Sequence, residues 1–359
     1  MKIVRIAIIL AITMIIVGII DSQNTTADRN RHVNTYIDKN SVSYNGKLRV
    51  EDEKILNAKG EEIQLTGISS HGIQWFGDLY TKDNIAQLKN ELDINIFRVA
   101  MYTDPKANGY IADTSLKQKV YELVDASIAL DIYVIIDWHI LGDNNPQTYQ
   151  QQAKEFFAEV SAKYADKPNV IYEICNEPNG NNVTWENNIY PYAKDIVATI
   201  REKTDALVIV GSGDWSKELG DVSKKPLEEK NIAYALHFYA GSHNKTLRDK
   251  IDDFREKKLA VFVSECGATD MTGDGKIYDE AFMRWVDYMH EKNISWLFWS
   301  YSNKKEGSSI LEPGYVPDFS SGIMDDSLLD SHLSESGKLV KKAIIKYKEK
   351  DSDYAEATN

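Results

Sequence analysis

The stretch Tyr133–Asp137 reads YVIID, a short and uninterrupted apolar run typical of a strand that is covered on both faces. Seven other runs rich in Ile and Val share this character: Gln64–Ile68, Ile94–Met101, Val170–Ile174, Leu207–Val210, Ile232–His237, Val261–Ser264 and Ile294–Ser300. Longer stretches with helical periodicity lie between the runs, for example Lys117–Leu130, Tyr149–Tyr164, Tyr190–Lys203 and Asp279–Lys292. This alternation of strand and helix predicts an α/β fold, a closed parallel (β/α)8 or TIM barrel.

The main competitor is an open, doubly wound parallel sheet. For nucleotide chemistry that sheet needs a Gly-rich phosphate turn after its first strand, and Gly67–Gly72 (GISSHG) does not have the required spacing. We therefore expect the barrel.

Shorter elements flank the predicted barrel. Asn45-Gly46 and Lys59-Gly60 separate short apolar segments, which predicts a small hairpin leading into the first strand. Lys338–Lys350 has the pattern of a closing helix. We thus expect one barrel domain over residues 43–350 and a polar, frayed tail over residues 351–359.

The amino terminus has the pattern of an export signal. Lys2 and Arg5 precede an apolar run from Ile6 to Ile20, which is short for a membrane span of roughly 20 residues. A small-x-small cleavage pattern is missing, so residues 1–20 are either a signal peptide or an uncleaved signal anchor; only the anchor would attach the protein to a membrane. Residues 21–42 read as a polar linker. Both alternatives predict a secreted or cell-surface protein.

Composition narrows the function classes. The chain has 359 residues, of which 42 are basic and 55 acidic, and its net charge is −13. This balance argues against a nucleic-acid partner, because phosphate binding needs a basic surface. The two cysteines form no disulfide framework, and no Cys/His cluster has the spacing of a zinc site, so we expect no metal. We expect a monomer.

Polar and aromatic residues follow nearly every predicted strand, where barrel enzymes carry their working groups. Glu177 and Glu265 stand out, because each ends an apolar run among His, Tyr, Asn and Arg candidates. A lone Glu at a strand end is more often solvated or salt-bridged. Two carboxyl groups facing each other across a barrel mouth, however, are the minimum needed to cleave a glycosidic bond. One, kept protonated, donates to the leaving oxygen, and the other, ionised, attacks the sugar carbon or activates water.

Four residues are candidates to support this pair. Arg98 would lower the pKa of the ionised carboxylate and fix its orientation; the alternative is a purely structural salt bridge inside the barrel. Tyr239 could donate a hydrogen bond to the same carboxylate. His139 and His237 lack a third metal donor at a suitable spacing, so we expect them to bond sugar hydroxyls or the carboxyl groups.

Aromatic side chains near the strand ends are candidates for stacking on sugar rings. They are Trp75, Tyr102, Trp215 and Trp299. A core position is the commoner alternative for any single Trp, and Trp299 is the best candidate because it ends the last strand. Trp296, in the same run, is expected to pack against the helices.

Taken together, these motifs resemble glycoside hydrolase family 5, or cellulase family A, over roughly residues 43–348. The segments that carry the resemblance are Ile94–Arg98, Asp137-Trp138-His139, Tyr172–Pro178 (YEICNEP), His237-Phe238-Tyr239, Ser264–Gly267 (SECG) and Trp296–Ser300 (WLFWS). The Asn-Glu-Pro motif occurs more widely among barrel glycosidases. Together with Ser70–Trp75 (SHGIQW) and Ser302–Glu306 (SNKKE), it resembles the bacterial-type endoglucanases.

The resemblance implies a retaining endo-β-1,4-glucanase acting on cellulose or mixed-linkage β-glucan, with no cofactor. It implies that Glu177 is the general acid/base and Glu265 the nucleophile, with carboxyl groups roughly 5–5.5 Å apart. Asn176 would bind the sugar 2-hydroxyl. Arg98 and Tyr239 would hold the nucleophile, and His139 and His237 would line the site. The glycone subsites would be shaped by His71, Trp75, Tyr102 and Trp299, and Trp215 would lie near the leaving group. Lys304 and Glu306 would contact hydroxyl groups farther out in the cleft.

The two cysteines depart from the family pattern. Cys266 stands where a bulky aromatic residue is usual, and Cys175 where Ala or Ser is expected. By strand alternation Cys266 points away from the face of Glu265, whereas Cys175 shares the parity of Glu177. We therefore expect the two thiols on different sides of the barrel wall and no disulfide between them.

Other functions remain open at this point. A β-mannanase or a xyloglucanase on the same barrel is the close enzymatic alternative, because pocket details decide the sugar. A catalytically silent glucan-binding surface protein is the alternative from another class, and the presence of both Glu177 and Glu265 argues against it.

Overall fold

A computed structural model describes residues 38–317 and 329–357 of the chain. The predicted signal segment, residues 1–20, and most of the predicted linker lie outside these residues. Lys39–Asn359 contains the fold discussed below. Within the described ranges, no helix combines the length and the apolar character that crossing a membrane requires.

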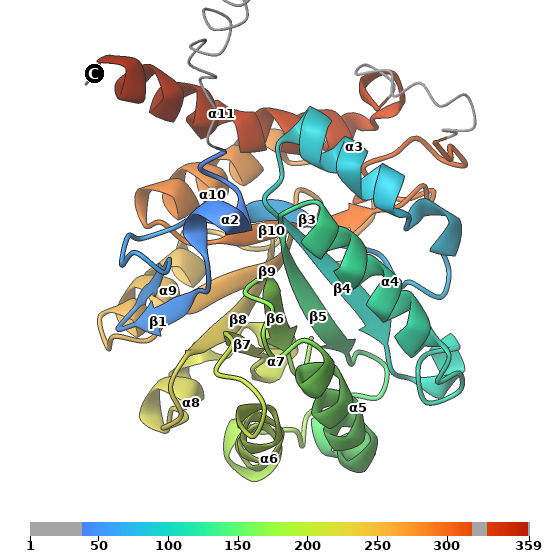
Figure 1. Ribbon diagram of the computed structural model, residues 1–359, viewed down its shortest axis with the longest axis vertical. Helices are drawn as coiled ribbons and strands as arrows, with labels where there is room; N and C mark the ends of the chain where they lie inside the picture. Colours follow the sequence, from blue (N-terminus) through green and yellow to red (C-terminus); the bar gives the residue numbers. More distant parts are fainter. Residues whose placement is uncertain (1–37, 318–328, 358–359) are drawn as a thin grey trace, which may run out of the picture. The chain divides into compact units, whose positions relative to one another are not determined.

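Eight parallel strands form a closed barrel in the order β10-β3-β4-β5-β6-β7-β8-β9, which confirms the predicted fold (Figure 1). Their bounds are β3 Thr66–Ser70, β4 Ile96–Tyr102, β5 Tyr133–His139, β6 Val170–Glu173, β7 Val208–Val210, β8 Ile232–Tyr239, β9 Val261–Gly267 and β10 Trp296–Tyr301. Each predicted run overlaps one of these strands. Four strands extend two or three residues beyond the carboxyl end of the predicted run: β3, β5, β8 and β9.

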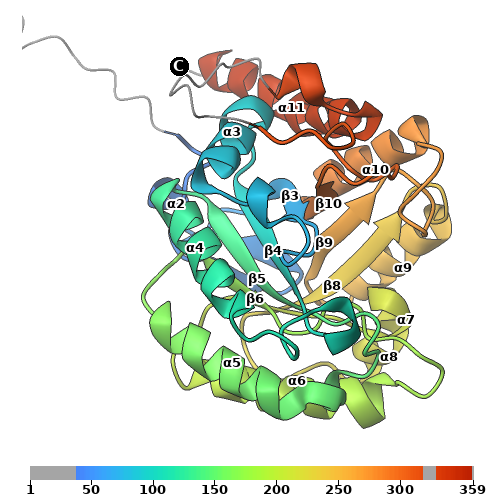
Figure 2. The same cartoon turned by 90° about the vertical axis from the view of Figure 1, so that its right-hand side faces the viewer.

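Helices surround the strands (Figures 1 and 2). Their bounds are α3 Lys82–Leu92, α4 Leu116–Ala129, α5 Gln150–Lys163, α6 Tyr190–Arg201, α7 Gly213–Ser216, α8 Leu219–Lys224, α9 Lys245–Arg255, α10 Asp279–Glu291 and α11 Glu335–Ala357. The four helices predicted as examples agree within two residues at each end. The closing helix α11 packs against α3 and α10, and it continues to Ala357 through most of the predicted tail.

The amino-terminal side of the barrel is covered by a short helix and a hairpin. Helix α2 spans Val42–Asn45, and strands β1 (Arg49–Glu51) and β2 (Lys54–Leu56) pair antiparallel, which confirms the predicted hairpin. Val42, Leu48 and Ile55 join the apolar cluster that fills this end of the barrel interior. Because this end is packed with apolar side chains, polar groups are confined to the opposite end.

Strand β5 shows how the interior is divided. Val134, Ile136 and Trp138 point outward into the apolar layer beneath the helices. Tyr133 and Ile135 alternate with them and point into the barrel, as the two-residue period of a strand requires. The next inward positions are Asp137 and His139, both buried. The interior is therefore apolar at the amino ends of the strands and charged at their carboxyl ends.

Candidate active site

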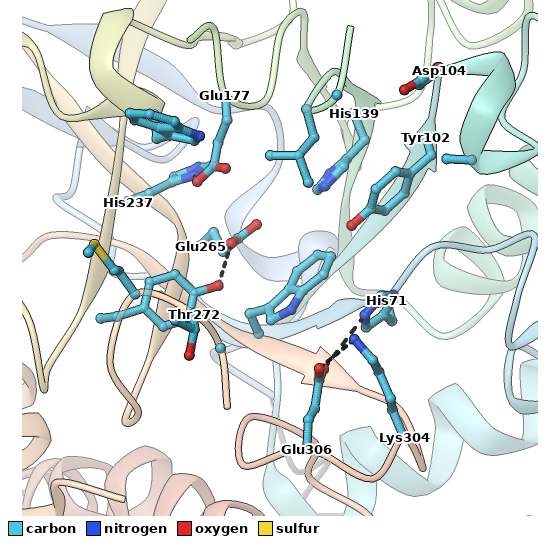
Figure 3. A pocket seen from close by; sticks show the side chains of 18 of the residues that line it. His71, Tyr102, Asp104, His139, Glu177, His237, Glu265, Thr272, Lys304 and Glu306 are labelled. Carbon is cyan, nitrogen blue, oxygen red and sulfur yellow. Dashed lines mark hydrogen bonds and ion pairs between the residues drawn. The ribbon is translucent and has the colours of Figure 1, made fainter. Parts of the chain in front are cut away.

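A cleft of about 890 Å³ opens at the carboxyl ends of the strands (Figure 3). It is lined by twelve of the residues predicted for the site: His71, Trp75, Tyr102, His139, Glu177, Trp215, His237, Tyr239, Glu265, Trp299, Lys304 and Glu306. Arg98 and Asn176, also predicted, are completely buried beneath the cleft. The structure thus brings together in one place residues that lie more than 230 positions apart in the sequence.

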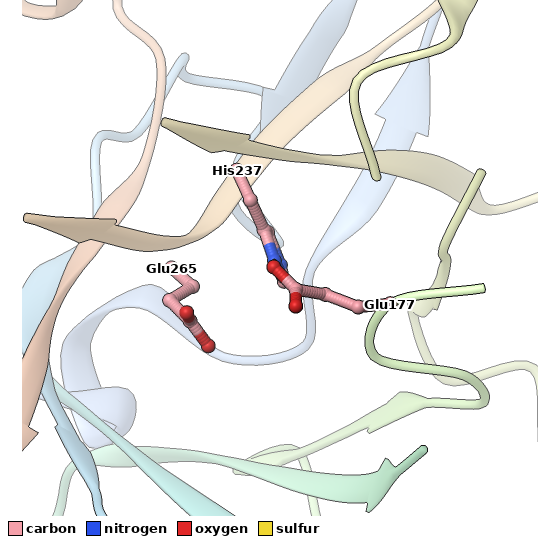
Figure 4. Close-up of side chains that lie close together, drawn as sticks. All are labelled: Glu177, His237 and Glu265. Atoms are coloured by element: carbon pink, nitrogen blue, oxygen red, sulfur yellow. The ribbon is translucent and has the colours of Figure 1, made fainter. Parts of the chain in front are cut away.

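Glu177 and Glu265 approach each other across this cleft (Figure 4). Glu177 follows β6, and Glu265 belongs to β9. One oxygen of each carboxyl group and one ring nitrogen of His237 all lie within 4.8 Å of one another. Inverting glycosidases separate their carboxyl groups by about 6.5–9.5 Å to admit a water molecule, whereas retaining enzymes hold them about 5–5.5 Å apart. The separation seen here fits direct attack on the sugar carbon.

A β-bulge in β9 turns two consecutive side chains into the barrel. Ala235 pairs with Phe262, but His237 pairs with Glu265, so β9 contains one residue more than β8 over this interval. The pairing of β9 with β10 shifts at the same place. A bulge leaves one residue unpaired and redirects the side chains next to it. As a result Ser264 and Glu265 both reach polar groups inside the barrel, while Cys266 packs in the outer apolar layer.

Arg98 of β4 is the centre of a buried network below the cleft. Its Nε donates to Glu173 Oε2 at 2.7 Å, and its Nη1 donates to Glu265 Oε2 at 3.2 Å. Its Nη2 donates to Asn176 Oδ1 at 2.7 Å and lies 3.0 Å from Asp137 Oδ2. A guanidinium offers five donors in a fixed plane, so this one side chain orients several carboxylates at once.

The electrostatic balance at Glu265 differs from the expectation. Burial raises the pKa of Glu265 above its usual value and the nearby Glu177 acts in the same direction, whereas His237, Arg98 and the Tyr239 hydroxyl oppose the rise. Arg98 therefore does lower the pKa as predicted, but burial outweighs it. Tyr239 donates to Oε1 at 2.7 Å, so both oxygens of Glu265 receive a hydrogen bond. These hydrogen bonds favour the ionised form of Glu265 and partly offset the effect of its burial.

Glu177 has the complementary arrangement. Among the described residues its side chain has one hydrogen-bond partner, His237 Nδ1, which lies 2.8 Å from Oε1. The second oxygen of its carboxyl group has no hydrogen-bond partner among these residues. The two carboxyl groups therefore differ in their surroundings, since Glu265 accepts two hydrogen bonds and Glu177 has one partner.

His237 is held as a cation. Burial opposes its charge, but the carboxylates of Glu173, Glu177 and Glu265 raise its pKa to about 10. The trio of Glu177, His237 and Glu265 has the spacing of a metal site. An imidazolium carries a proton on each nitrogen and offers no lone pair to a metal ion. The donor set therefore does not suit a metal.

His139 is fixed by the residue two positions before it. Its Nδ1 lies 2.6 Å from Asp137 Oδ2, and burial lowers the pKa of His139 well below its usual value. The neutral ring therefore donates from Nδ1 and accepts at Nε2, where Asn176 Nδ2 approaches to 3.2 Å. Asn176 Nδ2 also donates to the Ile140 carbonyl at 3.0 Å. A sugar hydroxyl that accepts from Asn176 Nδ2 would have to replace one of these bonds, whereas a hydroxyl that donates could use the second lone pair of Oδ1.

Aromatic rings form one wall of the cleft. The Trp299 ring stacks on His139 with a centroid distance of 5.3 Å, and Trp75 lies 4.7 Å from Tyr102. Trp75 is 44% exposed, whereas Trp299 is 6% exposed. Trp296, as predicted, points outward into the apolar layer beneath the helices.

A polar cluster of His71, Lys304 and Glu306 stands at the side of the cleft away from Glu177 (Figure 3). Burial, with a smaller effect of Lys304, lowers the pKa of His71 to about 3. His71 Nδ1 accepts the backbone N–H of Gly72 at 2.7 Å, so its Nε2 carries the proton and faces Glu306 at 3.6 Å. Lys304 Nζ lies 2.5 Å from the other oxygen of Glu306. This cluster offers both donors and acceptors for hydroxyl groups.

Trp215 stands on a turn with an uncommon backbone conformation. Asp214, Trp215 and Ser216 all have φ of 55°, the left-handed region that non-glycine residues seldom adopt. Ser216 Oγ donates to the Asn176 carbonyl at 2.6 Å, and the Trp215 N–H donates to the Pro178 carbonyl at 3.2 Å. These bonds join the turn to the residues on either side of Glu177. Trp215 is 44% exposed and lines the cleft.

The positions of the cysteines correct one expectation. Neither cysteine forms a disulfide, as predicted, but both lie in the same apolar layer outside the barrel. The reason is that β6 ends at Glu173, so strand alternation does not extend to Cys175. Its thiol donates to the Gly211 carbonyl at 3.7 Å.

Three buried residues of the site were missed from the sequence, Asp137, Glu173 and Ser264. Glu173 lies four positions before Glu177 and binds both Arg98 and Ser264. Its alternation with Ile171 inside β6 could have shown that it points inward. Ser264 had no such signal, because its inward direction depends on the bulge. The cleft is also lined by residues from loops that the sequence analysis did not consider: Asp104, Ala107, Leu141, Gly142, Asp214, Lys217, His243, Met271, Thr272 and Gly273.

Comparison with known proteins identifies the family. The family model described as cellulase, glycosyl hydrolase family 5, matches residues 56–305, which include every residue of the carboxylate pair and of the Arg98 network. The chain belongs to glycoside hydrolase family 5.

Curated relatives of this family 5 chain are bacterial. Endoglucanase N of Pectobacterium atrosepticum is 45% identical over 304 residues, 84% of this chain and 66% of that protein. Endoglucanase A of Evansella cellulosilytica is 48% identical over 259 residues, 72% of this chain and 53% of that protein. The chain thus spans between about half and two thirds of the length of these relatives.

Solved structures of family 5 share the barrel. Cellulase Cel5C_n aligns with a TM-score of 0.80 and 36% identity, covering 86% of this chain and 95% of that one. The catalytic domain of Thermobifida fusca endoglucanase Cel5A aligns with a TM-score of 0.77 and 34% identity, covering 84% of this chain and 98% of that one.

Proposed function

We propose that this chain is a retaining endo-β-1,4-glucanase that hydrolyses internal bonds of cellulose or mixed-linkage β-glucan. The observation that carries the proposal is the approach of Glu177 and Glu265 to within 4.8 Å, with hydrogen bonds to both oxygens of Glu265 and to one oxygen of Glu177. Its relatives are named endoglucanases, and a Thermobifida fusca neighbour was solved with cellotetraose.

The first step transfers the glycosyl group to the protein. Glu265 attacks the anomeric carbon while Glu177 gives its proton to the departing glycosidic oxygen, so a covalent glycosyl-enzyme forms and the leaving chain departs as an alcohol. Arg98 and the Tyr239 hydroxyl hold the attacking carboxylate at both oxygens. This fixes its direction before the substrate arrives.

The second step releases the sugar. Glu177, now ionised, takes a proton from a water molecule, which attacks the anomeric carbon and displaces Glu265. His237 keeps its hydrogen bond to Oε1 of Glu177 in both steps, so the second oxygen faces the reacting atoms throughout. Two inversions at one carbon give net retention.

The cleft provides separate surfaces for the two parts of the substrate. We assign the glycone side to His71, Trp75, Tyr102 and Trp299, with Lys304 and Glu306 bonding hydroxyl groups farther out. We assign the leaving-group side to Trp215. Aromatic faces suit the C–H faces of β-linked glucose, and the polar cluster suits its equatorial hydroxyls.

Two measurements test this function. The anomer formed from cellohexaose, followed by proton NMR in the first minutes, is expected to be β; an initial α product would refute a retaining mechanism. Initial rates on carboxymethylcellulose, lichenan, xyloglucan and galactomannan are expected to be highest on the first two. Faster hydrolysis of galactomannan or xyloglucan would assign the chain to the mannanase or xyloglucanase alternative.

We also propose that the protein acts outside the cytoplasm as a monomer. The support for the location is the basic and apolar pattern of residues 1–20; the oligomeric state is an expectation for the measurement to decide. Fractionation of expressing cells, with light scattering of the purified protein, tests both statements.

A further inference from the structure

A chain of hydrogen bonds runs from a buried carboxylate to the proposed acid/base. Ser264 Oγ donates to Glu173 Oε1 at 2.6 Å, and His237 Nε2 lies 3.0 Å from the same Ser264 oxygen. On its other side, His237 Nδ1 lies 2.8 Å from Glu177 Oε1. We call Glu173, Ser264, His237 and Glu177 the Glu173–Glu177 chain. Glu173 and Ser264 are completely buried and do not line the cleft, whereas His237 and Glu177 do.

The donors and acceptors in this chain can be assigned. Arg98 donates to Glu173 Oε2, and although burial opposes ionisation, Arg98 and His237 lower the pKa of Glu173 to about 2. An ionised carboxylate only accepts hydrogen bonds, so the single Ser264 hydrogen points to Glu173. The Ser264 oxygen can then only accept from His237 Nε2. His237 Nε2 must therefore carry a proton, which leaves Nδ1 as the nitrogen directed at Glu177.

We propose that Glu173 is a positioning residue: through Ser264 it keeps His237 protonated and directs its Nδ1–H at Glu177, which fixes the rotation of the acid/base carboxyl group. Glu173 touches no substrate, because it is completely buried and does not line the cleft. The inference rests on the proposed role of Glu177. The inference adds Glu173, four positions before Glu177 in the sequence, which acts on the acid/base through Ser264 and His237.

The charge around His237 comes from several elements. Acidic groups face it from β5, β6, the segment after β6, and β9, and the Arg98 guanidinium from β4; the neutral ring of His139 lies on β5. The acidic groups are Asp137, Glu173, Glu177 and Glu265. Of these, Glu173 is the carboxylate that reaches Nε2, directly at 3.7 Å and through Ser264. Its removal leaves Nε2 without an acidic partner.

The first test follows the protonation of His237 directly. Full-length protein labelled with [15N]histidine is titrated by NMR, and the His237 signal is assigned from a His237→Gln sample. Replacing Glu173 with Gln keeps the side-chain shape and removes the charge. We expect the His237 pKa to fall by about one to three pH units. A fall of less than one unit would overturn the proposal.

The second test separates acid positioning from damage to the nucleophile, since Glu173 also contacts Arg98. Phenyl β-cellobioside needs a proton donor for its leaving group, whereas 2,4-dinitrophenyl β-cellobioside does not. We expect Glu173→Gln to lower kcat/KM at least 10-fold more on the phenyl substrate, within the range for general acid catalysis. An equal fall on both substrates would mean that Glu173 acts through Arg98 or the fold, and would refute the inference.

Matched variants complete the experiment. Asp137→Asn removes another carboxylate from Arg98 outside the Glu173–Glu177 chain, and it should shift the His237 pKa less than Glu173→Gln does. Ser264→Ala breaks the hydrogen-bond chain and keeps the charge of Glu173. If Glu173→Gln does not fold, Ser264→Ala replaces it in both tests, with the same outcomes deciding.

Glu177→Gln reports on the proposed function, since it should preserve kcat/KM only for the dinitrophenyl substrate. If Glu177→Gln lowered kcat/KM equally on both substrates, Glu177 would not be the acid, and the NMR titration would still decide the role of Glu173.

Discussion

Ser264 and Glu265 are consecutive residues of β9, yet both side chains point into the barrel. The extra residue in β9 relative to β8 produces this arrangement. It allows one strand to supply the hydroxyl that contacts His237 and the carboxylate that Arg98 and Tyr239 hold. In a regular strand one of the two would face the helices. The bulge therefore links the two halves of the proposed catalytic pair.

Removal of either carboxyl group should abolish most activity, with a different signature for each. Glu265→Ala removes the attacking group, and we expect a loss of at least about 10³-fold in kcat on carboxymethylcellulose. Glu177→Ala should cost about 10²–10⁴-fold, the usual contribution of a positioned general acid. Sodium azide should restore turnover of 2,4-dinitrophenyl β-cellobioside, giving the α-glycosyl azide with Glu265→Ala and the β-azide with Glu177→Ala. The opposite assignment of anomers by NMR would exchange the two roles.

The hydroxyl of Tyr239 should tune the acidic limb of the pH profile. It donates to Glu265 Oε1 at 2.7 Å and so favours the ionised form. Tyr239→Phe should raise the pKa of Glu265 further, and the acidic limb of kcat/KM should move to higher pH. A charge-assisted hydrogen bond contributes about 1.5–3 kcal/mol, so a loss of roughly 10-fold or more is expected.

Tyr301→Phe is the matched control for that variant. The Tyr301 hydroxyl is buried and has no hydrogen-bond partner among the described residues. Its removal should leave the profile unchanged. If Tyr239→Phe also left the acidic limb in place, the hydrogen bond to Glu265 would have no role in its ionisation.

Trp215 should affect substrate use and not stability. Its ring is 44% exposed, and Trp215→Ala should change the melting temperature by no more than about 2 °C. Loss of one stacking surface, about 0.5–1.5 kcal/mol, should lower kcat/KM on cellopentaose roughly 2- to 10-fold. In contrast, Trp285 is completely buried and stacks on Phe238 at 4.0 Å, and Trp285→Ala should cost about 3–5 kcal/mol of folding free energy. Calorimetry and initial rates distinguish the two.

The stability of the protein should depend on His237 at alkaline pH. Its pKa rises on folding from an ordinary value of 6.5 to about 10, despite burial, because Glu173 and Glu177 favour the charged ring. A group with a raised pKa stabilises the folded state fully below its ordinary pKa, and this contribution is lost as the pH rises toward the folded value. The melting temperature of wild type should therefore exceed that of His237→Gln most at pH 6, with a difference that narrows toward pH 10. A constant difference would show that the ring is neutral in the folded protein.

The sequence predicted the barrel well because eight apolar runs all indicate the same fold, and an irregularity in one run does not change that prediction. The same reasoning placed Glu177, Glu265 and the aromatic residues at one end, since parallel strands share their carboxyl edge. The reasoning failed where the regular alternation of inward and outward side chains along a strand is interrupted. Ser264 was missed because of the bulge, and Cys175 was assigned to the wrong side because β6 ends at Glu173. The left-handed turn at Trp215 depends on hydrogen bonds to Asn176 and Pro178, which no local pattern encodes.

The buried network around Arg98 and the residues that line the cleft are carried by different parts of the fold. Arg98 lies on β4, and its partners come from β3, β5, β6 and β9 and from the segment after β6, so no single loop contains the network. The proposed sugar-binding residues Trp75, Trp215 and Lys304, by contrast, line the cleft from outside the strands. We therefore expect that exchanging loops would alter which polysaccharide is accepted and would leave the Arg98 network on the barrel strands intact.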